Sequence, residues 1–535
     1  MSDSMGFTMR AAAADAQGPP PCYGSSTMDA TSPLLAALHR SPDSLAFDVD
    51  GVALTWGQLD EGSLRVASGL LALGVAPGDR VAYFGPASVA LLELLVATLR
   101  IGAIYVPINT RYLAEETAHI LDDSGASVAV VAAGSVGHST ARDRSERLTV
   151  VVTEGAPGPG ETAFAALRAA DEPSPPHPAP PAPDVVAMLV YTSGTTGRSK
   201  GVALTHGGLA ANLDAILGLW RVGPADRMAL TLPLFHVHGL GLGVLGALMR
   251  GVPTLVATHF DAAWVIDAFA RRGATVFMGV PTMYARLLEH FAASPDSAGA
   301  LATGRLFTSG SAALPAAHHQ AFQAATGHVV LERYGMTETG FTLSNPYEGE
   351  RRAGTVGFAV PGVEVRLCDE ADATVSAGET GEIQVRGAGL LAGYWGLEEA
   401  TRASFTADGY FRTGDVAFAD ADGYFHIVGR RSVDIIKSGG FKISAREIED
   451  VILNVDGVAE VAVVGLPDAV WGERIVCAVV IRGDADADAV RARVAEQAAA
   501  RLADYKKPRE VLVVDALPRN ALGKLQKHRV RELFG

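Results

Sequence analysis

The stretch YTSGTTGRSKG, residues 191–201, decides the fold and the chemistry that this sequence predicts. It places glycines, hydroxyl side chains and Lys200 directly after an apolar run, residues 185–190, that indicates a buried strand. Glycines let backbone N–H groups approach phosphate oxygens, hydroxyls donate further hydrogen bonds, and a lysine adds a mobile positive charge. Lys200 does not directly follow a glycine, so the loop is not a Walker A motif. A flexible linker is the alternative, and the preceding buried strand argues against it.

The chain before this loop alternates between strand and helix patterns. Strands are predicted at residues 45–49, 52–55, 80–84 and 127–131, the first two as a hairpin around Asp50-Gly51, and helices at residues 33–37, 64–73 and 88–100. Such alternation predicts a parallel sheet covered by helices. Residues 155–183 are crowded with proline, alanine and glycine, which predicts an exposed connector.

The chain after the loop continues the alternation to about residue 360 and then changes character. Antiparallel strands are predicted at residues 363–367 and 381–386, and strands at 458–465 and 474–481 precede an alanine-rich helix at 485–503. The predicted fold class is α/β: mixed and parallel sheets covered by helices with a small β-barrel-like part, followed by a small mobile α+β domain. The predicted division is a disordered tail at 1–30, a large domain at 31–430 and a small domain at 431–535.

Composition limits the possible partners of the protein. The chain has 535 residues and a net charge of −15, so it is long enough for two domains and too acidic to favour nucleic acid or an anionic membrane surface. Cys22, Cys368 and Cys477 are scattered without a CxxC spacing. This pattern indicates neither a disulfide framework nor a zinc site, and it predicts a cytoplasmic protein.

The most apolar stretch, residues 228–249, is predicted to be core and pocket wall. Pro233, His236 and His238 interrupt it, and these residues would be costly in hydrocarbon, so no membrane span is predicted. Residues 241–246 match a GxGxxG pattern but lie inside this apolar run, without a clear preceding strand. We therefore interpret these glycines as sites of close packing.

Five motifs resemble those of one known superfamily, in the same order. They are residues 191–201, then YGMTET at 334–339, YFRTGD at 410–415, GR at 429–430 and PRNALGK at 518–524. Together they resemble the adenylate-forming enzymes, which include acyl-CoA synthetases, firefly luciferase and nonribosomal-peptide adenylation domains. The resemblance covers nearly everything after residue 32. It implies an enzyme that uses ATP and Mg²⁺ to form an acyl-adenylate and then transfers the acyl group to coenzyme A.

The resemblance implies a role for each motif. Glu338 would hold Mg²⁺ together with Thr196, Thr337 would donate to the α-phosphate, and Asp415 would accept from the ribose hydroxyls beside Arg430. Tyr334 would stack on adenine. The residues predicted to bind ATP are Thr192, Ser193, Gly194, Thr195, Thr196, Gly197, Lys200, Ser309, Gly310, Ser311, Glu332, Arg333, Tyr334, Gly335, Met336, Asp415 and Arg430.

The resemblance also assigns a catalytic lysine. Lys524 alone would be taken for a solvated surface charge, but its motif implies contact with the substrate carboxylate and the α-phosphate during adenylation. The small domain would then rotate about a hinge near residues 430–434, withdrawing Lys524 and presenting a second loop to the thiol channel. That loop supplies the predicted CoA contacts Lys437, Gly439, Gly440, Phe441 and Lys442.

The acyl pocket is predicted from residues 236–239, 279–286 and 309–312 with Met336. Residues 233–240, 278–284 and 332–346 look particularly like malonyl-CoA synthetases, so malonate, with methylmalonate as an alternative, is the expected acid. Arg286 lies one turn into a helix that Thr282 is expected to cap, where it would hold the second carboxylate. The alternative is a surface arginine paired with Glu289.

The remaining site predictions concern catalysis and substrate contact. His236 is either a gate or carboxylate contact, or a structural histidine. The predicted catalytic residues are Lys524, Glu338, Thr337 and His236, and the predicted acyl-substrate contacts are His236, Arg286, Ser309 and Met336.

Other functions remain open at this stage. A fatty-acid CoA ligase would need a long apolar tunnel; the glycine-rich run after Gly239 could supply one, but a charged end at Arg286 would reject an alkyl tail. An adenylation enzyme acting on a carrier protein would need a carrier segment, and none follows before Gly535. A luciferase-like oxygenase would need an oxidisable substrate. A regulatory nucleotide-binding protein would be expected to lack Lys524 or Glu338. The expected partners are a small carboxylic acid, ATP and CoA, with no nucleic acid and no membrane span.

Overall fold

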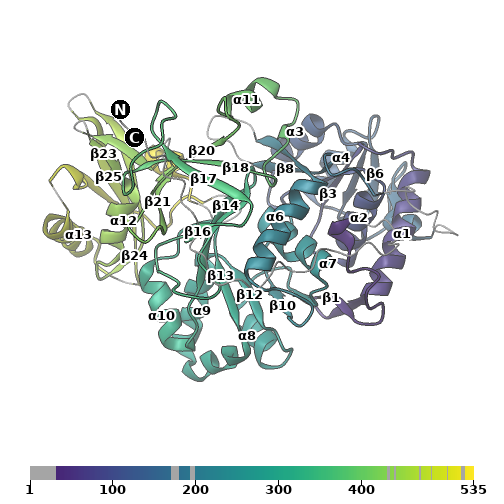
Figure 1. Cartoon of the computed structure of the whole chain (residues 1–535), viewed down its shortest axis with the longest axis horizontal. Helices are drawn as coiled ribbons and strands as arrows, with labels where there is room; N and C mark the ends of the chain where they lie inside the picture. The colour runs from purple at the N-terminus through teal and green to yellow at the C-terminus, as the bar shows by residue number, and fades with distance from the viewer. Residues whose placement is uncertain are drawn as a thin grey trace, which may run out of the picture.

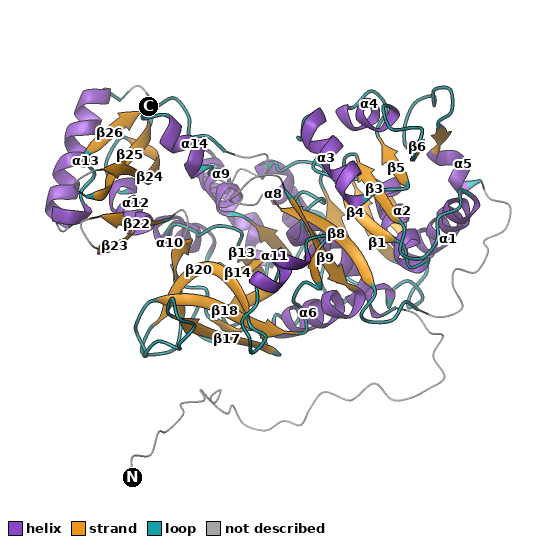
Figure 2. Ribbon diagram, turned by 90° about the horizontal axis from the view of Figure 1, so that it is seen from above, coloured by secondary structure: helices purple, strands orange, loops and turns teal. Residues whose placement is uncertain are grey.

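The computed structural model describes residues 32–169, 180–192, 199–430, 434–438, 441–468, 471–483, 485–502, 504–519 and 525–535. Its strands form four sheets (Figure 1). The two large sheets occupy the right and the centre of that view, and the C-terminal elements lie at the left. In the perpendicular view, helices cover the faces of the strands (Figure 2). The α/β class predicted from the sequence is confirmed.

The first large sheet contains the strand that leads into residues 193–199. Its order is β19 (Gly393–Tyr394), β9 (Lys200–Thr205), β8 (Val186–Thr192), β4 (Ile104–Pro107), β3 (Arg80–Phe84), β5 (Val128–Val131), β6 (Thr149–Val152) and β7 (Thr162–Ala163). The pairs from β8 to β7 are parallel, and β8, β9 and β19 pair antiparallel. Parallel strands need helical crossovers, which explains their continuous apolar runs.

The second large sheet is built from segments far apart in the sequence. Its order is β16 (Phe358–Ala359), β15 (Gly340–Ser344), β14 (Leu331–Met336), β13 (Leu306–Ser309), β12 (Val276–Gly279), β10 (Met228–Leu230), β11 (Thr254–Val256), β1 (Leu45–Val49) and β2 (Val52–Thr55). The predicted hairpin is β1–β2, and its turn residues Asp50 and Gly51 have φ of 46° and 90°. Both angles fit the type I′ turn that Asp-Gly favours.

Helices cover both large sheets. They are α1 (Trp56–Ala72), α2 (Val89–Arg100), α3 (Ala114–Ser124), α4 (Val136–Arg142), α5 (Phe164–Arg168), α6 (His206–Leu219), α7 (Gly246–Arg250), α8 (Ala262–Ala270), α9 (Pro281–Ala293) and α10 (Ala316–Thr326). A 3₁₀ turn covers Pro33–Leu35, another runs over Pro295–Thr303, and a π-helix spans Val237–Leu245. Ser88 accepts a hydrogen bond from the Leu91 N–H and is the N-cap of α2. The observed helix therefore begins at Val89, one residue after the predicted start.

Two smaller sheets follow. The four-stranded sheet runs β17 (Val363–Cys368), β18 (Gly381–Gly387), β20 (Phe411–Ala419) and β21 (Phe425–Arg430), all antiparallel, with α11 (Glu398–Ala403) between β19 and β20. The last sheet runs β23 (Phe441–Ser444), β22 (Ile435–Ser438), β25 (Gly472–Ile481) and β24 (Val458–Asp468), with β26 (Glu510–Val513) parallel to β25. Helices α12 (Ala445–Leu453), α13 (Ala487–Arg501) and α14 (Lys527–Glu532) and a 3₁₀ turn at Asp504–Lys506 complete it.

Three predicted elements differ from the structure. The helix predicted at 33–37 is a single 3₁₀ turn, and the helix predicted at 64–73 begins earlier, at Trp56, where Thr55 and Gln58 form a capping box. The connector predicted at 155–183 contains β7 and α5. Phe164 and Leu167 of α5 are buried, so this part packs onto the domain rather than crossing its surface, while residues 170–179 lie outside the described residues.

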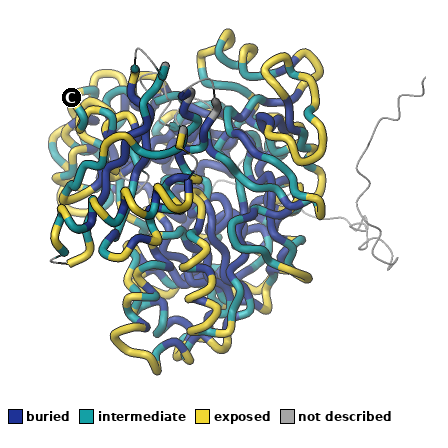
Figure 3. The backbone as a smooth tube through the Cα atoms, turned by 90° about the vertical axis from the view of Figure 1, so that its left-hand side faces the viewer, coloured by how far each residue is buried: buried dark blue, intermediate teal, exposed yellow. Residues whose placement is uncertain are grey.

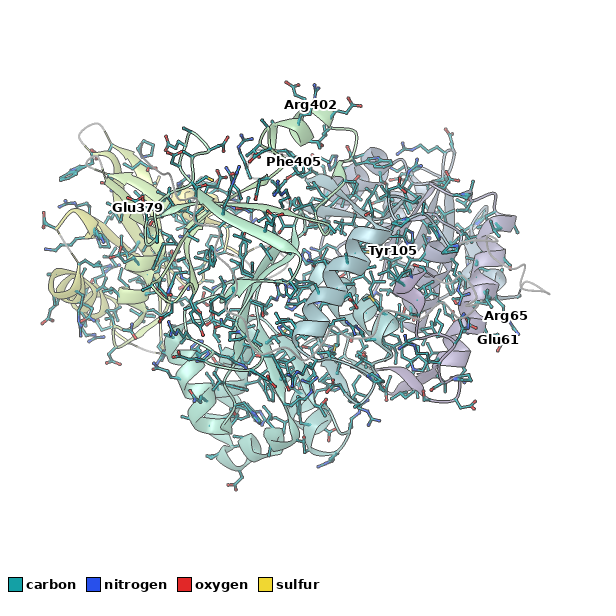
Figure 4. All side chains as sticks on the ribbon, in the orientation of Figure 1. Glu61, Arg65, Tyr105, Glu379, Arg402 and Phe405 are labelled. Carbon is teal, nitrogen blue, oxygen red and sulfur yellow. The ribbon has the colours of Figure 1, made fainter. Side chains whose placement is uncertain are left out.

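The interior explains how the two large sheets hold together. One apolar cluster draws on both sheets and on α1, α2 and α6, and buried segments run unbroken through the centre of the molecule (Figure 3). Tyr105 of β4 points into this interior, whereas Glu61 and Arg65 form an i,i+4 pair on the exposed side of α1 (Figure 4). The last sheet has a separate core on each of its faces.

Candidate active site

The ends of three strands meet at the buried carboxylate of Glu338. Thr192 and Lys200 are register partners where β8 ends and β9 begins, and Tyr394 of β19 pairs with β9. Glu338 is 7% exposed and makes long contacts from Oε1 to the Thr192 hydroxyl at 3.4 Å and the Tyr394 hydroxyl at 3.3 Å. The Tyr394 ring also faces Lys200 Nζ, 5.0 Å from its centroid. Burial raises the pKa of Glu338.

A second carboxylate, Asp415, lies between two predicted ATP-binding residues. Asp415 in β20 and Arg430 in β21 are register partners, and Arg430 Nε donates to Asp415 Oδ1 at 2.9 Å. The Tyr334 hydroxyl donates to Asp415 Oδ2 at 2.7 Å. Burial and the charge of Asp415 raise the pKa of Tyr334. The structure therefore brings these three residues together, and their contacts with ATP stay predictions.

Glu332 holds loops rather than facing open space. Its carboxylate accepts from the Gly354 N–H at 3.0 Å and from the Leu314 N–H at 3.2 Å. The residue is 4% exposed, and burial raises its pKa to about 7. Two loops that follow β13 and β15 are thus fixed by a single buried side chain, and the place of Glu332 in the adenine wall stays a prediction.

Arg333 is a buried cation at the predicted acyl end of the site. It is 5% exposed and packs between the Phe341 ring, whose centroid lies 4.8 Å from its Cζ, and Gly310. A Cβ at Gly310 would lie 2.5 Å from Arg333 Cζ, so only glycine leaves room there. Nε and Nη2 are buried with no hydrogen-bond acceptor among the described residues. Burial lowers the pKa of Arg333 to about 9, so the guanidinium is charged at neutral pH.

His238 is a neighbour of Arg333. Its Nδ1 lies 3.3 Å from the hydroxyl of Ser311, which has a φ of 67°. Burial, followed by the charges of Arg333 and His236, lowers the pKa of His238 well below its usual value. A neutral imidazole therefore lies beside a charged guanidinium, and the two form a positively charged end to the predicted acyl pocket.

The remaining predicted pocket residues surround this end. Ser309 is buried where β13 ends, and Met336 packs partly buried against the main core. A Cβ at Gly335 would lie 2.1 Å from the Gly340 carbonyl oxygen, where the β14–β15 register shifts, so this position requires glycine. Thr337 lines an apolar cavity together with Val237.

The π-helix Val237–Leu245 forms the wall that the sequence predicted, with His236 at its N-cap. A Cβ at Gly239 would lie 2.4 Å from the Pro233 carbonyl oxygen, and one at Gly243 would lie 2.6 Å from Leu230. The interpretation of these glycines as close-packing sites is confirmed. Single π-turns are frequent at functional sites because they shift side chains relative to a regular helix.

Arg286 lies in α9, and the start of this helix differs from the prediction. Val280, not Thr282, is the N-cap, and Pro281 occupies the first turn. Arg286 is exposed, whereas Met283, Tyr284 and Leu287 are buried. The contact of Arg286 with a second carboxylate stays a prediction.

Several predicted residues lie outside the described residues. They are Ser193, Gly194, Thr195, Thr196 and Gly197 of the glycine-rich loop, Gly439, Gly440 and Lys524; the backbone of Lys437, Phe441 and Lys442 is described, but their side chains are not. Residues 1–31 and 431–433 fall outside as well. The roles predicted for all of these residues stay predictions.

Comparison with known proteins now decides the family. Residues 34–395 match the model described as AMP-binding enzyme, and residues 447–524 match the AMP-binding enzyme C-terminal domain. The chain belongs to the AMP-binding enzyme family. The resemblance to the adenylate-forming superfamily, which was drawn from five motifs, is therefore confirmed.

Similar proteins cover most of this AMP-binding enzyme. It is 38% identical to the feruloyl-CoA synthase of Amycolatopsis sp over 93% of this chain and 97% of the relative. It is 33% identical to a malonate–CoA ligase of Arabidopsis thaliana, over 95% and 89% respectively, and 37% identical to a sulfoacetate–CoA ligase of Cupriavidus necator, over 91% and 92%. ATP-bound MatB from Rhodopseudomonas palustris superposes with a TM-score of 0.85 at 37% identity, covering 94% of this chain and 99% of MatB.

These relatives establish the reaction class. The AMP-binding enzyme is an ATP-dependent acyl-CoA ligase, an acid–thiol ligase whose substrates are ATP, CoA and a carboxylic acid. The relatives' names differ in the acid, so they do not define the substrate of this chain. Throughout the part of the chain that the structure describes, no helix is both long and apolar enough to cross a bilayer.

Sequence reasoning missed one residue of this site. Tyr394 was not singled out, although it contacts both Lys200 and Glu338. Arg333 was named for the ATP site, which stays a prediction, and its position beside His238 was not foreseen. The position of Tyr394 depends on β19 joining β9, a pairing between segments almost 200 residues apart that no local pattern indicates.

Proposed function

We propose that this ligase activates a short dicarboxylic acid, with malonate the first candidate and methylmalonate the second. One carboxylate is adenylated by ATP with release of pyrophosphate, and CoA then displaces AMP to form the thioester. Relatives named for malonate and for sulfoacetate support this proposal, because both acids carry a second anionic group. A carboxylate or sulfonate at the far end of the substrate is the feature that the proposal requires.

The buried guanidinium of Arg333 carries the proposal. A charge without a counter-ion in a protein interior costs several kcal/mol, so such groups are normally paired. Arg333 is 5% exposed, and the described residues offer no acceptor to its Nε and Nη2. The second anion of a diacid supplies that partner through a charge-assisted, bidentate contact. His238 next to it donates or accepts one further hydrogen bond.

The other end of the site suits ATP. Lys200 and the glycine-rich loop hold the phosphates, and Asp415 with Arg430 holds the ribose. Glu338 fits a magnesium ion because the two hydroxyl contacts of its buried carboxylate, with Thr192 and Tyr394, are both long. No group of three or more ligating side chains gathers among the described residues, which suits an ion held mainly by phosphates and one carboxylate. Mg²⁺ bound there would neutralise charge on the phosphates. Lys524 and Thr337 are proposed to contact the α-phosphate.

A second candidate function is activation of an alkyl acid. An apolar cavity lies between α6 and β15, lined by Leu204, Leu209, Leu213, Val237, Phe341 and Leu390, and it reaches Thr337. The cavity measures about 10 Å³, room for about one water molecule, so an alkyl chain would enter only if the cavity widened, and it would leave Arg333 without a counter-ion. The diacid is therefore favoured.

The test is CoA-dependent AMP production from ATP and Mg²⁺ with malonate, methylmalonate, sulfoacetate, ferulate and octanoate in parallel. Malonate or methylmalonate is expected to give the highest kcat/KM. If ferulate or octanoate leads, the substrate proposal fails, while the reaction class stands. Arg286→Ala is assayed beside Arg271→Ala, which changes the C-cap arginine of α8, whose side chain is 82% exposed. A selective loss of malonate activity in Arg286→Ala alone would assign Arg286 to the substrate despite its exposure.

A further inference from the structure

The carboxylate of Asp434 lies at the point where the chain passes from β21 to β22. Arg430 N donates to Asp434 Oδ2 at 2.9 Å, and Asp434 N donates to the Arg430 carbonyl at 2.7 Å. Gly429 has a φ of 146°, and a Cβ there would lie 2.5 Å from Asp434 Cβ. Asp434 therefore packs on Gly429 and bonds to Arg430, and both Asp434 and Arg430 belong to the predicted hinge near residues 430–434.

The other oxygen of Asp434 binds Lys527, the first residue of α14. Lys527 Nζ lies 2.7 Å from Asp434 Oδ1 and 2.8 Å from Glu449 Oε1 of α12. The Lys527 side chain is 7% exposed, and Glu449 Oε1 also accepts from the Val463 N–H of β24 at 2.8 Å. One buried ammonium thus joins Asp434 to α12, to α14 and, through Glu449, to the last sheet.

The ammonium is charged in this position. Burial alone would lower the pKa of Lys527, but the charges of Glu449 and Asp434 outweigh burial and raise it. Removing the ammonium would leave two half-buried carboxylates close together without their shared cation, which destabilises a protein. This ion pair therefore does more than a solvent-exposed pair, which contributes little.

The contact lies close to Lys524 along the chain. Lys527 is three residues beyond Lys524, so the two Cα atoms can be at most about 11 Å apart. The loop that contains Lys524 is closed at its base by a bridge between Arg519 and Leu525 and by the Gln526 N–H donating to the Pro518 carbonyl at 2.8 Å. Lys527 follows this base directly, so whatever holds Lys527 also limits where the loop lies.

We propose that Lys527 is a positioning residue: by binding Asp434 and Glu449, it holds the base of the loop that contains Lys524 against α12 and against the residue that precedes β22. The contact thereby sets where Lys524 lies when it reaches the acyl-adenylate site. This inference rests on the proposed role of Lys524 in adenylation. It predicts that loss of the buried contact slows adenylation and leaves the CoA step unchanged, because the second step does not use Lys524.

The experiment measures the two half-reactions separately, using the acid with which the wild type turns over fastest. Adenylation is followed as acid-dependent ATP–pyrophosphate exchange, and the second step as thioester formation from the synthetic acyl-adenylate and CoA. The variants are Lys527→Met, Lys527→Arg and the triple variant Lys527→Met/Asp434→Asn/Glu449→Gln, which removes all three charges and leaves no unpaired buried ion. Lys506→Met is the matched control, because Lys506 also pairs with α12, at Glu447, but lies more exposed.

A positioning role predicts that the triple variant melts near the wild-type temperature yet exchanges at least about tenfold more slowly, since misplacing a catalytic group by about 1 Å costs up to about 100-fold. Its thioester step should be within about twofold of wild type. Lys527→Arg should keep more exchange than Lys527→Met, and Lys506→Met should match the wild type. A folded triple variant with wild-type exchange, or an equal loss in both half-reactions, overturns the inference.

Lys524→Ala separates this inference from the function on which it rests. If Lys524→Ala exchanges at the wild-type rate, the proposed role of Lys524 in adenylation fails, and the role of Lys527 fails with it. If Lys524→Ala loses exchange while the folded triple variant does not, only the inference about Lys527 fails.

Discussion

Replacing Arg333 with methionine should stabilise the ligand-free enzyme while impairing its reaction. Burial lowers the pKa of Arg333 from its ordinary value to about 9, and a shift of this size corresponds to about 5 kcal/mol of unfavourable burial of the charge. Losing the contact with the Phe341 ring costs about 2 kcal/mol of this gain. Methionine fills a similar length, so the free energy of unfolding should rise by about 3 kcal/mol.

The assay is urea unfolding of wild type and Arg333→Met, each with and without malonate. Malonate at about 100 times its dissociation constant should stabilise the wild type by about 3 kcal/mol and the variant far less, because the variant lacks the partner for the second carboxylate. Arg271→Met, at an exposed position, should change neither value. A ligand-free variant less stable than wild type, or one that malonate stabilises as strongly as wild type, would refute the reasoning.

Three further changes test other parts of the structure. The pKa of Glu332 is raised to about 7, so above pH 4.5 the native state binds more protons than the unfolded state. The free energy of unfolding of the wild type, relative to Glu332→Gln, should therefore fall by about 2 kcal/mol from about pH 5.5 to 8. If urea unfolding shows the same difference between the two proteins at every pH, this prediction is wrong. Tyr394→Phe removes a hydroxyl contact with the predicted metal-binding carboxylate, and the loss of roughly 1 kcal/mol should raise the apparent KM for Mg²⁺ severalfold. Tyr410→Phe, whose hydroxyl contacts Glu364 instead, should leave this KM unchanged. Equal KM values in the two variants would count against the site. Gly243→Ala should cost about 1–3 kcal/mol in thermal unfolding because its Cβ would meet Leu230, whereas Gly223→Ala has open space and should cost far less; similar losses would contradict the packing.

The parts of the fold that the sequence predicted well are those with strong local signals. The hairpin around Asp50-Gly51 was placed at its observed bounds because strand alternation and an Asp-Gly turn agree there. Helix α5 was missed because the proline-rich composition of the surrounding residues concealed its two buried residues, Phe164 and Leu167. Their spacing of three was the available signal, since residues i and i+3 share a helix face.

The candidate site was predictable in its parts but not in its arrangement. Motif order placed Glu338, Asp415 and Arg430 in one site, and the structure places Asp415 against Arg430. The orientation of Arg286 could have been found from helix phase, since Met283, Tyr284 and Leu287 define the buried face of α9 and leave residue 286 outside it. The burial of Arg333 could not, because it depends on Gly310 and Phe341, which come from two other strands and loops.

The place of β1 in the second large sheet bears on how the chain is made. Phe47 pairs with Thr254, 207 positions later, so β1 has no parallel partner until β11 has been synthesised. At about 5–20 residues per second, this delay is about 10–40 s. During that time the hairpin presents an unpaired apolar edge of the kind that promotes aggregation. Chaperone contacts with the nascent chain are therefore expected to concentrate on residues 45–55 until β11 emerges from the ribosome.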